Sequence, residues 1–193
     1  MFSPLLLTNM SYSKVSLMKF FCQVFLSSFL YSTVIYAGNE IAGESYIQPI
    51  QPFVLMKDIN RQADAWAICS ATWTIMSMLS SKKSDHVVQN YKNLSNGAKA
   101  AVAMTFIKPT LVSAEEFNEN KYEATVTYAT EAMNFLPEAA LTSIMADYDL
   151  RGTDVWFKNV TKTLKVCTEN LEEQQAYIDL WRTLATSGLM KLD

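Results

Sequence analysis

Cysteine is the residue type in this sequence with the most obvious chemical potential. Cys69 stands in DAWAICSATWTIMSML, residues 64–79, between two tryptophans. A nucleophilic cysteine needs a nearby base, normally a histidine, that stabilises its thiolate form. The single histidine of the chain, His86, stands in a polar turn beyond this segment. We therefore expect Cys69 to be structural rather than catalytic.

The N-terminal residues 1–37 have the layout of a secretory signal peptide. A lysine-containing start leads into FFCQVFLSSFLYSTVIYA, and small polar residues follow Ala37. The apolar run is shorter than the ~20 residues that span a bilayer, and it contains several hydroxyl groups. We expect cleavage after Ala37, with Met18 as an alternative start of translation. An uncleaved membrane anchor is the competing interpretation.

Export decides how the cysteines are interpreted. Cys22 lies in the signal segment and is removed with it, which leaves Cys69 and Cys167. Oxidising compartments favour the pairing of an even set, so we predict a disulfide bond between these two residues. Four nitrogen or sulfur ligands at the spacing of a zinc site do not occur in the sequence, and we predict no metal and no cofactor.

The segment DYDLRGTD matches the start of a calcium-binding loop only in part. Asp147, Asp149 and Gly152 fit three of the loop positions. Arg151 and Lys158 occupy two further positions at which an oxygen ligand belongs. We therefore interpret this segment as the end of one helix and the start of the next.

The composition fits one helical domain. The chain has 193 residues, of which 50% are hydrophobic and 18% are charged, and it contains few glycines and prolines. Its net charge of −3 and its low arginine content differ from those of nucleic-acid binders, so we expect no nucleic-acid partner. The motifs G-x-S-x-G and H-E-x-x-H and a glycine-rich phosphate loop do not occur, and we expect no enzymatic activity.

Three segments divide the chain. The signal segment is followed by residues 38–60, where QPIQPF predicts an extended arm whose apolar residues, including Phe53, lie on the domain surface. Apolar residues then recur at helical spacing, which predicts an all-α, single-domain bundle of five or six helices over residues 61–193.

Local signals set the expected helix boundaries. Pro109 is expected to end one helix, Ser113 and Glu116 form a capping box for the next, and Pro137 begins another. Within YEATVTYAT, residues 122–130, a strand competes with a helix because many side chains are β-branched or aromatic. The predicted helices span residues 61–80, 84–107, 113–134, 137–151, 155–166 and 171–186, with glycine stops at Gly152 and Gly188 and caps at Asp154 and Asn170.

The first of these helices is expected to be the centre of the bundle. Trp66, Cys69, Trp73 and Met76 recur at spacings of three, four and three residues, so they share one helix face. Large apolar side chains on one helix face are usually buried in the core of a bundle. As an alternative, they line an interior site for a small apolar ligand. The candidate lining residues are Trp66, Trp73, Met76, Trp156 and Trp181.

The pattern as a whole favours a protein that is exported to a periplasm or outside the cell and binds another, unidentified protein. An inhibitor, an immunity factor, a chaperone-like factor and an envelope accessory factor all fit this description. The alternative function is a carrier of a small apolar ligand. We expect contact with a membrane only through an uncleaved signal segment.

A stripe of Lys158, Lys162 and Lys165 is typical of a solvated helix face.

Overall fold

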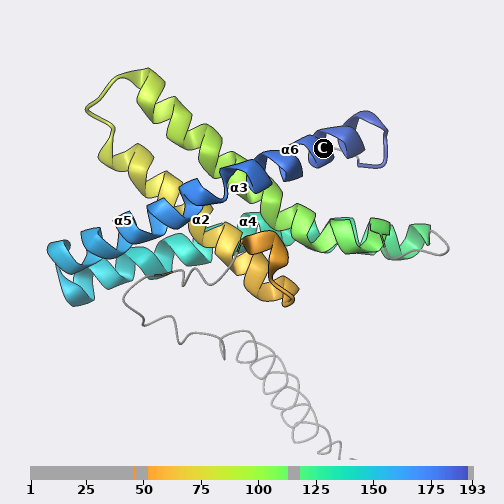
Figure 1. Cartoon of the computed structure of the whole chain (residues 1–193), viewed down its shortest axis with the longest axis horizontal. Coiled ribbons are helices and arrows are strands. Elements are labelled where there is room, and N and C mark those ends of the chain that lie inside the picture. Colours follow the sequence, from red (N-terminus) through yellow and green to blue (C-terminus); the bar gives the residue numbers. More distant parts are fainter. Residues whose placement is uncertain (1–45, 47–51, 113–117, 191–193) are drawn as a thin grey trace, which may run out of the picture. The chain divides into compact units, whose positions relative to one another are not determined.

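The computed structural model describes Tyr46, residues 52–112 and residues 118–190. This part of the chain contains five α-helices and one short 3-10 helix and no strand, which confirms the predicted all-α bundle (Figure 1). The predicted signal segment, including Met18 and Cys22, lies outside the described residues, as does most of the predicted arm. The elements are η1 (Phe53–Leu55), α2 (Ile59–Leu79), α3 (Asp85–Val112), α4 (Glu119–Arg151), α5 (Thr153–Glu169) and α6 (Leu171–Thr186).

Helix α2 is the centre of the bundle, as its composition predicts. Its buried residues lie on all sides of the helix, and it packs against α3, α4 and α5. The carboxylate of Asp58 accepts hydrogen bonds from the backbone N–H groups of Asn60 and Arg61 and so caps the helix. Among the described residues, no helix is both long enough and apolar enough to cross a membrane.

The predicted surface arm contributes to the core. Phe53 is fully buried, and its ring meets that of Trp66 edge to face with 4.8 Å between centroids. The prediction that Phe53 lies on the surface is therefore wrong. The following residues Val54 and Leu55 remain exposed, because the single turn of η1 directs only one of its three side chains inward.

Helix α3 continues beyond the proline that is expected to end it. The predicted end at residue 107 is wrong, because the helix runs through Pro109 to Val112. A proline inside a helix removes one backbone hydrogen bond. Ile107 is fully buried and Leu111 packs against the core, so tertiary packing on both sides of the proline offsets that loss.

Helix α4 replaces two of the predicted helices. The predicted break at Pro137 does not occur, because this proline is buried inside a continuous helix from Glu119 to Arg151. The side chain of Asn118 caps the helix by accepting a hydrogen bond of 3.0 Å from the backbone N–H of Lys121. The predicted capping box of Ser113 and Glu116 lies outside the described residues. Residues 122–130 are helical, so the helix prediction is confirmed over the strand.

Helices α5 and α6 complete the bundle. Gly152, with a φ of 77°, ends α4 as predicted, and α5 runs back alongside the end of α4 (Figure 1). Asp154 lies in the first turn of α5 rather than at its cap. Asn170 stands at the predicted cap position of α6, but its side chain accepts a hydrogen bond of 3.0 Å from the backbone N–H of Phe53 instead. The predicted capping role of its side chain is wrong, because the contact with η1 takes its oxygen.

Candidate functional site

The two cysteines form a buried cross-link. Cys69 in α2 and Cys167 in α5 are joined by a disulfide bond, with their Cα atoms 5.5 Å apart. Both side chains are fully buried. His86 is exposed in the first turn of α3. The strongest candidate for nucleophilic chemistry in the sequence is therefore a structural bond.

The tryptophans proposed to line a ligand site are packed against other parts of the chain. Trp66 is fully buried between the rings of Phe53 and Tyr177. Trp73 stacks on the ring of Tyr91 with centroids 5.9 Å apart. Two further members, Met76 and Trp181, are only partly buried.

Trp156 is anchored by a hydrogen bond as well as by packing. Its indole N–H donates to the carbonyl oxygen of Ile144 in α4 at 2.8 Å, and its ring meets that of Tyr148 edge to face. The five proposed lining residues thus come from three helices, α2, α5 and α6, and the contacts of Trp66, Trp73 and Trp156 are those of core residues. The carrier role remains a prediction.

A buried polar contact connects α2 to α6 beside Trp66. The Nε2 atom of Gln62 donates a hydrogen bond of 3.1 Å to the hydroxyl of Tyr177. Burial raises the pKa of Tyr177 above its ordinary value of 10.0, while hydrogen bonds with Gln62 and Thr105 act in the opposite direction. The Nζ atom of Lys108 lies 5.5 Å from the centre of the same ring. These contacts orient α6 against α2 and α3, and sequence periodicity gives no signal for them.

The calcium-like segment carries an ion pair and a hydrogen bond to the predicted arm. Arg151 Nε lies 2.7 Å from one carboxylate oxygen of Asp147. The other oxygen accepts a hydrogen bond of 2.6 Å from the hydroxyl of Tyr46. Burial, then the hydrogen bond and the charge of Asp147, raise the pKa of Tyr46 far above its ordinary range. Among the described residues, no group of acidic, histidine or cysteine side chains is arranged to hold a metal ion.

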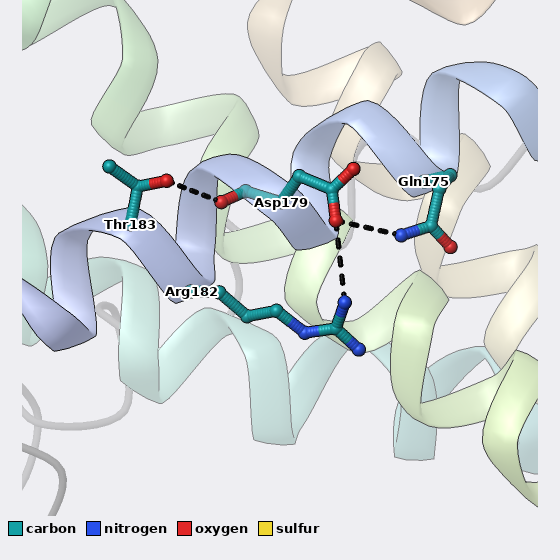
Figure 2. Close-up of polar contacts among 4 residues, drawn as sticks. All are labelled: Gln175, Asp179, Arg182 and Thr183. Atoms are coloured by element: carbon teal, nitrogen blue, oxygen red, sulfur yellow. Dashed lines mark hydrogen bonds and ion pairs between the residues drawn. The ribbon is translucent and has the colours of Figure 1, made fainter.

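The polar contacts around Asp179 on α6 are local to that helix. The Oδ1 atom of Asp179 accepts a hydrogen bond of 2.9 Å from Gln175 and lies 3.3 Å from Arg182, and Thr183 donates to its backbone carbonyl (Figure 2). All four residues are exposed. Contacts at spacings of three and four residues stabilise a solvated helix by a few tenths of a kcal/mol each. We assign them no further role.

One face of α4 is exposed along most of the helix. Eight positions at alternating spacings of four and three residues share this face and are all exposed. We call them the α4 strip. They are Ala124, Tyr128, Glu131, Phe135, Glu138, Thr142, Met145 and Asp149. At a rise of 1.5 Å per residue, the strip is about 37 Å long.

The α4 strip combines large apolar side chains with carboxylates. Tyr128 and Phe135 are each 54% exposed, and Met145 is 40% exposed. The ring of Tyr128 meets that of the partly buried Phe106 with centroids 5.0 Å apart, which extends the apolar surface onto α3. Apolar patches on a protein surface are a common mark of interaction sites, and these side chains lie along one face of α4.

The charges of the α4 strip are all negative. Within the described part of the chain, Glu131, Glu138 and Asp149 belong to no ion pair. The strip itself contains no lysine or arginine, and Lys121 lies one helical turn before its first residue. The sequence contains this spacing, but the expected break at Pro137 divides it into two short pieces, which is why it does not stand out without the structure.

A second exposed apolar group lies on both sides of Gly152. Leu150, at 83% exposed, Val155 and Phe157 belong to it. The charged residues among them have both signs, because Arg151 and Lys158 alternate with carboxylates. On α5, Lys165 lies 3.8 Å from Glu169. This second surface therefore has no net preference for the charge of a partner.

No protein-family model, no curated protein and no solved structure matches this chain.

Proposed function

We propose that this protein is exported and acts by binding another protein, without catalysing a reaction itself. The observation that carries the proposal is the α4 strip, in which Tyr128, Phe135 and Met145 remain exposed along one face of a long helix. Burial of apolar area yields about 25 cal/mol per Å², so leaving such side chains in water forgoes stabilisation that a partner surface would supply. Aromatic residues are also enriched in protein interfaces.

The disulfide bond supports the export part of the proposal. Such bonds form and persist in oxidising compartments, and this one joins two fully buried sulfur atoms in the described domain. Cleavage of the signal segment is expected after Ala37. Mass spectrometry of the exported protein should give a chain that begins at Gly38, and a mass that includes residues 1–37 would contradict cleavage.

Site-specific photo-cross-linking tests the binding surface. A benzoylphenylalanine at Phe135 replaces one exposed aromatic side chain with another, and the same probe at Gln175, exposed on α6, is the matched control. Irradiation of cells that make each variant should give a discrete heavier adduct at residue 135 only. The absence of an adduct at residue 135, or equal adducts at both positions, would contradict binding through the α4 strip.

A further inference from the structure

The charge of the α4 strip indicates which kind of partner it fits. We infer that the strip binds a basic amphipathic helix of a partner protein. This inference rests on the proposed function and names the chemistry of the same surface. Glu131 and Glu138 flank the exposed ring of Phe135, and neither belongs to an ion pair in the described part of the chain.

The geometry of the strip is compatible with a partner helix, because rows of side chains on two helices can pack along each other. Its alternating spacings of four and three residues are those by which one helix packs along another. A partner helix with apolar residues at the same spacing would cover Tyr128, Phe135 and Met145. Lysine or arginine residues beside those apolar positions would then lie within reach of Glu131 and Glu138.

A second copy of the chain is the less favourable occupant on the same grounds. Two α4 strips packed on each other would gather six carboxylates with no lysine or arginine in either strip, and an excess of like charge opposes association. The basic stripe of α5 offers Lys158, Lys162 and Lys165, but the apolar residue at the matching spacing is only Val155. That stripe supplies positive charge without the apolar side chains that the exposed rings of the α4 strip require.

Two synthetic peptides test the inference. Both carry leucines at alternating spacings of three and four residues, and one has lysines beside the leucines where the other has glutamates. Fluorescence anisotropy should show the exported protein binding the lysine peptide at least about tenfold more tightly than the glutamate peptide. Added salt should weaken binding of the lysine peptide, because its contacts with Glu131 and Glu138 are electrostatic.

Variants on and off the strip give the controls. Phe135→Ala and the double change Glu131→Gln/Glu138→Gln should each weaken binding of the lysine peptide about tenfold. The pair Glu172→Gln/Glu173→Gln makes the same change of net charge on α6 and should have no such effect. Circular dichroism should show unchanged helix content in all variants, since the changed residues on α4 are exposed.

The outcomes separate this inference from the proposed function. If both peptides bind equally and Phe135→Ala weakens both alike, the inference of a basic partner is overturned. The proposal that the strip is a binding surface then still stands. Insensitivity of all binding to Phe135→Ala would overturn both. If Glu172→Gln/Glu173→Gln weakens binding of the lysine peptide as much as Glu131→Gln/Glu138→Gln does, the peptide is attracted by net charge alone, and the inference is overturned. A dimer in sedimentation experiments that Phe135→Ala dissociates would identify a second copy as the occupant instead.

Discussion

Removal of the cystine measures how strongly the link between α2 and α5 stabilises the fold. The perturbation is the double change Cys69→Ala/Cys167→Ala. The bond joins residues separated by 98 positions. In the chain-entropy account, a closed loop of that length disfavours the unfolded chain by about 4.7 kcal/mol at 25 °C. Domains are stable by only ~5–15 kcal/mol in total, so we expect loss of a large part of the free energy of unfolding.

Urea denaturation of three forms separates the covalent link from the packing of the side chains. The oxidised protein is the reference, the reduced protein keeps both buried sulfur atoms, and the double alanine variant removes them. We expect the reduced protein to lose roughly 3–5 kcal/mol and the alanine variant to lose somewhat more, because its core also loses packing. Reductant should not change the stability of the alanine variant, which is the control for side effects of the reductant.

A small loss would refute this reasoning. If reduction lowers the free energy of unfolding by less than about 1 kcal/mol, the loop closed by the bond does not restrict the unfolded chain as the entropy account requires. A slope of the urea dependence that differs between the oxidised and reduced forms is expected, because the reduced unfolded chain exposes more surface. Labelling of the denatured, oxidised protein should find no free thiol at Cys69 or Cys167.

Three further predictions concern close contacts in the bundle. At Gly97, an added Cβ atom would lie 2.5 Å from Nε2 of Gln174 and 2.8 Å from Cδ1 of Ile178. In thermal unfolding, Gly97→Val should therefore lower the free energy of unfolding by about 2–3 kcal/mol. The control Asn96→Val, on the exposed side of the same turn, should have little effect. Tyr46→Phe removes a hydrogen bond of 2.6 Å to Asp147 and should lower the free energy of unfolding by roughly 1.5–3 kcal/mol, and equal stability in urea denaturation would contradict this contact. Because the pKa of Tyr177 is raised by burial, the folded protein keeps the phenol proton at a pH at which the unfolded chain has lost it. The contribution of Tyr177 to the free energy of unfolding is therefore fully present below pH 10.0 and falls as the pH rises above that value. Tyr177→Phe should make the loss of stability at alkaline pH less steep, and an unchanged pH profile would contradict the assignment.

The parts of the fold that depend on regular spacing could be predicted from the sequence. The apolar spacing around Trp66 and Cys69 identifies α2 and its central position, and the parity of cysteines in a chain predicted to be exported predicts the bond to Cys167. Gly152 ends α4 as expected, because a positive φ favours glycine. These signals are local or purely compositional, so no tertiary structure is needed to detect them.

The parts that depend on contacts between distant residues could not be predicted. Pro109 and Pro137 are local signals for helix ends, yet both lie inside continuous helices, with core residues around Pro109 and with Pro137 itself buried. The side chain of Asn170 has the right type for a cap but contacts Phe53, which is distant in the sequence. The α4 strip becomes evident only once α4 is known to be continuous, because its exposure depends on which faces the other helices cover.

The contacts of the last two helices also determine when the chain can fold. Cys69, Gln62 and Phe53 all find their partners near the end of the chain, at Cys167, Tyr177 and Asn170. A ribosome or a translocation channel releases these partners last, so a chain that is still emerging lacks these three contacts, while α3 and α4 are already available to pack on α2. We therefore expect the fold to be completed only after α5 and α6 have emerged, and a truncation before α5 to leave part of α2 uncovered and the fragment prone to aggregation. Under the proposed export, this order would leave the last contacts of the bundle unformed until the end of the chain has been threaded.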